Sequence, residues 1–308
     1  MSRRKVAVIG SGNVGATTAQ LIVQKGLADC VMIDIIEGMP QGKALDLSQS
    51  TPLEGADVRV EGSNDFARME GCDIVVITAG LARTPGMSRE DLAAKNNQIV
   101  RGVAQKIKQV APRSIVIVVS NPLDIMTSIV WRETSRDDRR VMGMAGVLDS
   151  ARFRFFIAQK LGVSVKEVSA MVLGGHGDLM VPLERFATVS GIPIHSFLSP
   201  KEIAPLIERT RDGGAEVVKL LKQGSAFYAP AASVAIMVES ILKDEKQLLP
   251  CCVRVNGEYG LKDVFCGVPV ILGREGVERI VELDLTQEEL AALHKSAESV
   301  RKGMLQLK

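Results

Sequence analysis

The chain has 308 residues, enough to bury a large core and to form two domains of ordinary size. Its 38 Lys and Arg residues nearly balance its 36 Asp and Glu residues, and no long basic block occurs, so the charge pattern excludes a nucleic-acid-binding surface and favours a small-molecule ligand. The longest aliphatic runs are far shorter than the roughly 20 residues of a membrane-spanning helix, so we expect a soluble protein with no membrane contact.

The cysteines and the first residues of the chain indicate an intracellular compartment. The five cysteines are odd in number and lack the C-x-x-C spacing of a zinc or redox site, so we expect reduced, buried thiols. The basic start, residues 1–5, is followed by only four apolar residues, Val6 to Ile9, too few for an export signal. The sequence therefore predicts a cytoplasmic protein without a bound metal.

Short aliphatic runs alternate with helical segments through the first half. The runs are continuous, which suits a parallel sheet covered on both faces, and stretches of helical composition at residues 15–25 and 92–110 separate them. This βαβ repetition predicts an α/β fold with a doubly wound parallel sheet. The predicted strands are Val6 to Ile9, Cys30 to Ile35, Val58 to Val60, Ile74 to Ile77, Ile115 to Val119 and Val141 to Met144.

A glycine-rich motif follows the first predicted strand. Gly10-Ser11-Gly12-Asn13-Val14-Gly15 has the G-x-G-x-x-G spacing of a Rossmann turn, which brings the backbone and a helix N-terminus close to a pyrophosphate. A structural glycine turn is the alternative for such a motif by itself. Asp34 favours the cofactor interpretation, because it ends the second strand 19 residues after Gly15 and can bind ribose hydroxyls.

The residues around Asp34 narrow the choice of cofactor. Its carboxylate repels a 2′-phosphate, and neither Ile35 nor Ile36 can bind one, so the sequence favours NAD over NADP. S-adenosylmethionine stays open at this point, since its binders also place an acidic residue after the second strand.

The pattern changes after about residue 144. Two predicted helices, residues 150–161 and 205–223, accompany four alternating strands, residues 168–172, 185–189, 251–255 and 268–272. From Thr286 onward, a capping box with Glu289 and apolar residues spaced by three and four predict a further helix. We therefore expect a dinucleotide-binding domain at residues 1–144 and a mixed α+β domain for substrate binding and catalysis at residues 145–308.

One of the three histidines, His176, lies between glycines in Leu173-Gly174-Gly175-His176-Gly177-Asp178. An imidazole titrates near neutral pH, so a ring with little bulk around it can exchange a proton with a ligand. The alternative is a turn whose histidine binds a backbone carbonyl. We expect the other two histidines, His195 and His294, to be structural or exposed.

Three further segments lie at or near the carboxyl ends of predicted strands, where ligands of open α/β sheets bind. They are Leu81 to Arg89, Ser120-Asn121-Pro122 and Leu148 to Arg152. Together with the glycine-framed histidine, they resemble the malate and lactate dehydrogenase family, in particular the malate dehydrogenases built on the lactate dehydrogenase plan. The resemblance covers essentially the whole chain.

The resemblance implies the NAD-dependent, reversible oxidation of a small dicarboxylate, (S)-malate, to oxaloacetate. His176 is then the proton acceptor, Asp149 orients its ring, and Arg152 grips the C1 carboxylate. A carboxylate bonded to one ring nitrogen fixes the tautomer and stabilises the imidazolium. A guanidinium offers the two-pronged geometry that lysine lacks.

The resemblance also assigns the loop arginines and the remaining ligands. Arg89 polarises the substrate carbonyl as part of the catalytic set, and Arg83 selects the substrate, because lactate dehydrogenases typically carry glutamine there. Solvated surface charge is the alternative for both, although the flanking glycines and proline look like a lid with defined bends. Asn121 binds the substrate oxygen. The implied cofactor-binding residues are Gly10, Ser11, Gly12, Asn13, Val14, Gly15, Asp34, Asn96, Val119, Ser120 and Asn121.

Other functions compete with this interpretation. A lactate or other 2-hydroxyacid dehydrogenase is the nearest, and a non-catalytic dinucleotide-binding protein comes from a different class. A methyltransferase has no use for the His-Asp pair or the three arginines. The resemblance further implies a homodimer or homotetramer and a place in the tricarboxylic acid cycle.

Overall fold

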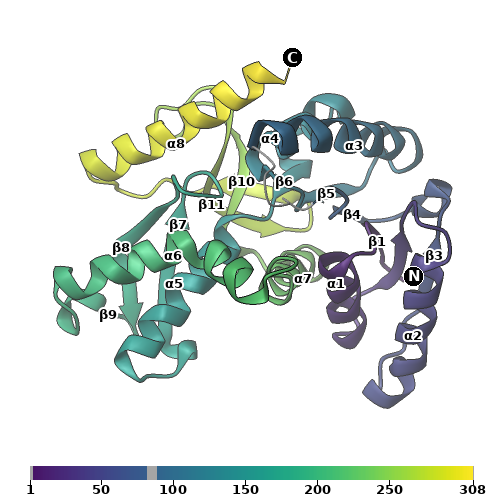
Figure 1. The fold of residues 1–308 in the computed structure, drawn as a ribbon, viewed down its shortest axis with the longest axis horizontal. Helices are drawn as coiled ribbons and strands as arrows, with labels where there is room; N and C mark the ends of the chain where they lie inside the picture. Colours follow the sequence, from purple (N-terminus) through teal and green to yellow (C-terminus); the bar gives the residue numbers. More distant parts are fainter. Residues whose placement is uncertain (1–2, 82–88, 308) are drawn as a thin grey trace.

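The computed structural model describes residues 3–81 and 89–307, which contain a nine-stranded and a three-stranded sheet (Figure 1). The large sheet has the order β12-β11-β10-β6-β5-β4-β1-β2-β3, and its first-half strands pair in parallel. The strand order reverses at β1, so the carboxyl ends of β1 and β4 border a crevice. The first-half strands are β1 (Lys5–Ile9), β2 (Asp29–Ile33), β3 (Val60–Ser63), β4 (Ile74–Ile77), β5 (Ile115–Val118) and β6 (Val141–Gly143).

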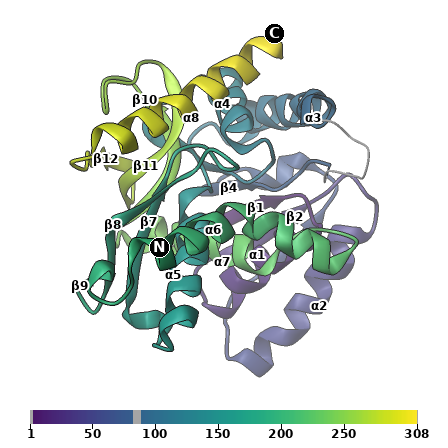
Figure 2. The same cartoon turned by 60° about the vertical axis from the view of Figure 1, so that its left-hand side comes forward.

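Helices cover both faces of the large sheet, and successive strand residues enter different cores. In β1, Val6 and Val8 pack with α1 and α7, whereas Ala7 and Ile9 pack with α3 and α4. Figures 1 and 2 show these two helix pairs on opposite sides of the sheet. The α-helices are α1 (Asn13–Gln24), α2 (Met39–Glu54), α3 (Arg89–Val110), α4 (Leu123–Thr134), α5 (Gly146–Leu161), α6 (Pro200–Leu221), α7 (Tyr228–Lys243) and α8 (Gln287–Gln306), and the 3-10 helices are η1 (Phe66–Met69), η2 (Asp138–Arg140), η3 (Val165–Glu167) and η4 (Ile194–Ser196).

The second half builds a small sheet and also extends the large one. β7 (Val168–Leu173), β8 (Val181–Val189) and β9 (Ile192–Pro193) form the antiparallel small sheet, which shares a core with α5 and α6. The doubly wound sheet and the mixed second half are thus confirmed. The addition to the large sheet was not predicted: β10 joins β6 through the pair Cys252 and Gly143. The added strands are β10 (Gln247–Val255), β11 (Val264–Gly273) and β12 (Gly276–Ile280).

The capping box at the start of α8 is confirmed. Thr286 Oγ1 accepts a hydrogen bond from the Glu289 backbone N–H at 3.2 Å, and a Glu289 carboxylate oxygen accepts from the Thr286 N–H at 2.8 Å. The apolar side of α8, including Leu293 and Ala297, is buried on the body of the protein. Some predicted boundaries were wrong: α6 begins at Pro200 rather than residue 205, and β3 lies at residues 60–63 rather than 58–60.

The cysteines lie in the core, as the sequence predicted. All five cysteines are buried and unpaired. Among the residues that the structure describes, no helix is long and apolar enough to cross a membrane. The same residues contain no cluster of three His, Cys, Asp or Glu side chains that could hold a metal ion.

Candidate active site

The glycine motif forms a tight cradle between β1 and α1. A Cβ atom on Gly15 would lie 1.8 Å from the carbonyl oxygen of Gly10, so only glycine allows the strand and helix to approach this closely. Gly10 has φ +99°, and its Cβ would lie 2.8 Å from the Ala79 nitrogen. Gly12 faces open space, because a Cβ added there would have no neighbouring atom within 4 Å. The cradle is therefore closed by Gly10 and Gly15 and open toward solvent at Gly12.

Asp34 holds the cradle from the end of β2. Its Oδ2 accepts from the Ser11 backbone N–H at 2.6 Å, and its Oδ1 accepts from the Ile36 N–H at 3.0 Å. Lys43 on α2, which sequence reasoning missed, donates to the Ser11 carbonyl at 2.6 Å. The Ser11 hydroxyl is buried and has no hydrogen-bond partner within residues 3–81 and 89–307. This orphaned hydroxyl, the N-terminus of α1 without a side-chain cap, and the nearby carboxylate fit the phosphates and ribose of a dinucleotide.

The loops after β4 and β5 are joined by Asn96. This α3 side chain is fully buried; its Oδ1 accepts from the Leu81 N–H at 2.7 Å, and its Nδ2 donates to the carbonyls of Asn121 at 2.7 Å and Leu81 at 3.2 Å. In the second loop, Ser120 Oγ donates to the Ala79 carbonyl at 2.6 Å. Asn96 thus uses its amide to fix the backbone on which Asn121 is presented.

His176 and Asp149 form a buried pair, as the sequence suggested. His176 Nδ1 and Asp149 Oδ2 are 2.8 Å apart, and their side chains are 16% and 2% exposed. Burial opposes the charged imidazole, but attraction and hydrogen bonding to Asp149 outweigh it, so the pKa of His176 is raised above its ordinary value. The ring therefore binds a carboxylate rather than a backbone carbonyl. Because Nδ1 is engaged, Nε2 is the nitrogen that can exchange a proton with a ligand.

Arg152 lies next to this pair on α5. Its Nη1 is 3.2 Å from Asp149 Oδ1, so Asp149 contacts the imidazole and the guanidinium with different oxygens. On α6, Gly213 and Gly214 face the arginine: a Cβ on Gly213 would lie 3.0 Å from Arg152 Cδ. The paired glycines leave room for the guanidinium, which keeps further N–H donors for a carboxylate.

Three structural elements hold the backbone of the His176 loop. The Gly174 N–H donates to the Gly267 carbonyl on β11 at 2.8 Å, and the Gly175 N–H donates to Ser296 Oγ on α8 at 2.7 Å. The His176 N–H donates to Asp124 Oδ2 on α4 at 2.9 Å. Sequence reasoning missed Ser296 and Asp124. The one available signal was a lone carboxylate in the apolar run that begins at Leu123.

The two loop arginines cannot be placed with the others. Arg83 lies outside the described residues, and for Arg89 the structure gives only the backbone at the start of α3. The remaining histidines agree with the prediction. His195 is exposed in η4, 4.0 Å from Glu184, and His294 Nε2 is 2.7 Å from the Tyr259 carbonyl.

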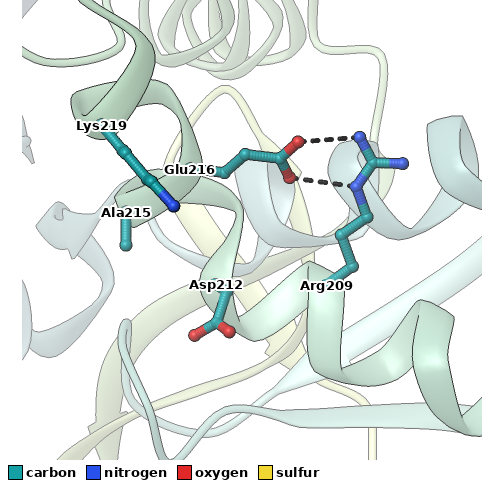
Figure 3. Close-up of a pocket in the computed structure, with 5 residues that line it drawn as sticks. All are labelled: Arg209, Asp212, Ala215, Glu216 and Lys219. Carbon is teal, nitrogen blue, oxygen red and sulfur yellow. Dashed lines mark hydrogen bonds and ion pairs between the residues drawn. The ribbon is translucent and has the colours of Figure 1, made fainter.

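A hollow on the surface of α6 does not compete with this site (Figure 3). Its lining comes from that helix, and its Arg209 and Glu216 pair with each other at 2.8 Å. Arg209 also stacks over the Phe156 ring, 4.4 Å from its centroid. Because Arg209 and Glu216 neutralise each other and one helix supplies the lining, the hollow differs from ligand sites, which form where several elements converge.

Comparisons with known proteins cover the whole chain. A family described as lactate/malate dehydrogenase, NAD binding domain, matches residues 4–143, and its alpha/beta C-terminal domain matches residues 146–308. The malate dehydrogenase of Roseiflexus sp. (strain RS-1) is 51% identical over 306 residues, which cover 99% of each chain. The solved apo malate dehydrogenase of Picrophilus torridus is 45% identical with a TM-score of 0.96, covering 99% of this chain and 97% of that one.

Lactate dehydrogenases are similar as well. The Cryptosporidium parvum enzyme, solved with lactic acid and nicotinamide adenine dinucleotide, is 43% identical with a TM-score of 0.97, covering 100% of this chain and 98% of that one. The fold therefore does not by itself distinguish the two substrates.

Proposed function

The chain belongs to the lactate/malate dehydrogenase family, and from this premise we propose that it catalyses the NAD-dependent, reversible oxidation of (S)-malate to oxaloacetate. The observation that carries the proposal is the buried His176–Asp149 pair beside Arg152, which places an acid-base group next to a carboxylate-binding group. Such a set suits a 2-hydroxy acid, whose hydroxyl and carboxylate lie on neighbouring carbons.

The cofactor site uses the cradle between β1 and α1. NAD, when bound, supplies the group that accepts hydride from malate C2 or returns it to oxaloacetate. The glycine motif and Ser11 would hold its phosphates, Asp34 its ribose hydroxyls, and residues 119–121 would line the nicotinamide side. Asn96 supports this region through the backbone of Asn121.

The proton follows a path through His176. In malate oxidation, the C2 hydroxyl gives its proton to Nε2 as the C2–H bond breaks with its electron pair, and the C2 oxygen becomes a carbonyl. Asp149, 2.8 Å from Nδ1, stabilises the resulting imidazolium. Arg152 binds the C1 carboxylate, and Asn121 donates to the C2 oxygen. In reduction, the same imidazolium returns the proton.

The loop arginines complete this assignment. We assign Arg89 to the charge that develops on the C2 oxygen and Arg83 to the second carboxylate of malate. We propose a functional division at residues 144 and 145, supported by the family models that match residues 4–143 and 146–308; the cofactor groups then lie in the first half and the acid-base pair in the second.

An NADH assay with two ketoacids tests the function. Oxaloacetate should cause rapid loss of NADH absorbance, and pyruvate should cause little. A lactate dehydrogenase would reverse this preference. NADH binding without oxidation in the presence of either ketoacid would instead support the non-catalytic alternative.

Replacing Arg83 with Gln should shift the preference from oxaloacetate toward pyruvate. The neutral amide cannot pair with the extra carboxylate, and a lost charge pair in a dry site costs about 2–5 kcal/mol, or roughly 30- to 5,000-fold in kcat/KM. The measurement is the ratio of kcat/KM for the two ketoacids. An unchanged ratio would show that Arg83 does not select the substrate.

The raised pKa of His176 predicts opposite pH profiles for the two directions. Reduction needs the imidazolium, so it should persist above the ordinary histidine pKa of about 6.5 and decline only as the pH passes the raised pKa. Malate oxidation needs the neutral ring and should rise through the same pH range. In Asp149→Asn the favourable charge is lost while burial remains, so both midpoints should move to lower pH. Profiles of kcat/KM in both directions check this, and unmoved midpoints would contradict it.

We further propose a cytoplasmic homodimer or homotetramer that serves the tricarboxylic acid cycle. Exposed apolar side chains support self-association: Leu53 on α2, Leu220 on α6 and Tyr228 on α7 are 89%, 74% and 73% exposed. Light scattering on the purified protein would measure its mass, and a monomeric mass would contradict the proposal.

A further inference from the structure

Asp124 is a buried carboxyl group for which the reaction described above has no use. The residue is 7% exposed, and its Oδ1 has no nitrogen or oxygen donor in the described parts of the chain; the Cys252 thiol, a weak donor, lies beside the carboxyl group. Burial raises its pKa, while the bond from the His176 backbone N–H opposes this rise. Because an under-satisfied buried carboxyl group costs stability, its presence here calls for an explanation.

The position of Asp124 in the chain connects two parts of the active site. It lies in the first turn of α4, three residues after Asn121, the proposed ligand of the substrate C2 oxygen. Its side chain reaches the His176 N–H at 2.9 Å. One short segment thus carries a substrate ligand and also holds the backbone of the proton acceptor, which belongs to the loop after β7.

The other two hydrogen bonds that fix the His176 loop come from different elements of the fold. Gly267 on β11 and Ser296 on α8 bind the two preceding N–H groups. Neither belongs to the Asn121 loop. The contact with α4 is also close, because a Cβ on Gly175 would lie only 3.2 Å from Asp124 Oδ2. Of these three hydrogen bonds, the one that the His176 N–H donates to Asp124 fixes His176 relative to Asn121.

We propose that Asp124 is a positioning residue. It keeps the His176 ring at a fixed position relative to Asn121, so that both side chains can contact the same substrate oxygen. The proposal rests on the proposed function, because it assumes that these two residues share a substrate. A displacement of about 1 Å in such a site can reduce turnover roughly 100-fold.

The charge of Asp124 could act on His176 in a second way. The charged groups that affect the ring are Asp149 and Arg152 from α5 and Asp124 from α4. Asp124→Asn removes the charge but keeps an oxygen that can accept from the His176 N–H. Asp124→Ala removes both. The difference between the two variants therefore measures the positioning effect.

Kinetics of the full-length protein test the proposal. Asp124→Ala should lower kcat for oxaloacetate reduction about 10- to 100-fold with unchanged NADH affinity, and it should raise the deuterium isotope effect of C4-deuterated NADH, because misplacement slows the hydride and proton transfer itself. Asp124→Asn should recover most of this loss. If the alanine variant does not fold, Asp124→Ser replaces it, since its shorter side chain also withdraws the acceptor.

Thr127→Val is the matched control. Thr127 is buried one turn further along α4, and its hydroxyl donates to the Leu123 carbonyl at 2.8 Å. The variant also removes a contact with the Cys252 thiol, but it leaves the bond from the His176 N–H to Asp124 in place, so its kcat should stay normal. Equal losses in Thr127→Val and Asp124→Ala, or an asparagine variant as slow as the alanine variant, would overturn the positioning role.

A readout without turnover separates this proposal from the proposed function. The chain has three histidines, so the imidazole NMR signals of His176 can be assigned with single variants. Asp124→Ala should move the His176 ring away from Asp149 and lower the pKa of His176 more than Asp124→Asn does. Identical His176 titrations in both variants would contradict positioning. A wild-type protein that does not reduce oxaloacetate would instead refute the proposed function.

Discussion

Replacing His176 with asparagine is expected to reduce kcat for oxaloacetate about 100- to 10,000-fold, the usual contribution of general acid-base catalysis. Asparagine fits the space and can still bond to Asp149, but its amide does not exchange a proton near neutral pH. The cofactor cradle between β1 and α1 does not involve this loop, so NADH affinity should be unchanged. Steady-state kinetics and fluorescence titration with NADH measure the two quantities.

His195→Asn provides the matched control for this result. His195 is exposed in η4 and lies 4.0 Å from Glu184, so the same substitution there should leave turnover intact. Near-normal turnover of His176→Asn would remove this histidine from the mechanism. Loss of NADH binding in the same variant would instead indicate damage to the fold.

Replacing Arg152 with lysine should lower kcat/KM for oxaloacetate about 100-fold, equivalent to about 2.7 kcal/mol of transition-state stabilisation. Lysine keeps the charge but has no planar fork to bind a carboxylate with two parallel hydrogen bonds. The guanidinium also contacts Asp149 Oδ1 at 3.2 Å, and it occupies the space that Gly213 leaves on α6. Much of the loss should appear as a raised KM, because the substrate carboxylate is bound before and during the reaction.

Arg154→Lys separates the binding role from a general effect on α5. Arg154 lies two residues further on the same helix, where its Nε donates to the Val168 carbonyl at 2.7 Å. Its variant should have a near-normal KM for oxaloacetate. If both lysine variants lose the same fraction of kcat/KM, the effect comes from the helix rather than from carboxylate binding.

Elements with a local pattern could be predicted from the sequence, and those shaped by distant contacts could not. β4 coincides with its predicted run, Ile74–Ile77, because a short aliphatic segment between turns is typical of a buried strand. The helices α4 and α7, which are buried on most sides, were not predicted. The joining of β10 to β6 depends on a pairing between Cys252 and Gly143 that no local signal reports.

The chemistry of the site was predicted from family resemblance together with residue types, but its geometry was not. His176 and Asp149 are 27 positions apart, and their contact was inferred from family resemblance before the structure placed them 2.8 Å apart. Asn96 was expected near the cofactor, and the structure shows its amide holding the backbones of Leu81 and Asn121. Asp124 was not predicted as a site residue, because the burial of a side chain depends on the assembled fold rather than on neighbours in sequence.

The His176 loop depends on a hydrogen bond to α8, the last helix of the chain to be synthesised. Ser296, whose hydroxyl binds the Gly175 N–H, lies 121 positions after that glycine. The bond from the Ser11 N–H to Asp34 in the cofactor cradle spans 23 positions, although α7 must later cover one face of β1. The histidine loop cannot reach its final shape until α8 has been synthesised and has docked. The reacting histidine is therefore fixed only near the end of synthesis, after all the residues of the dinucleotide site have been made.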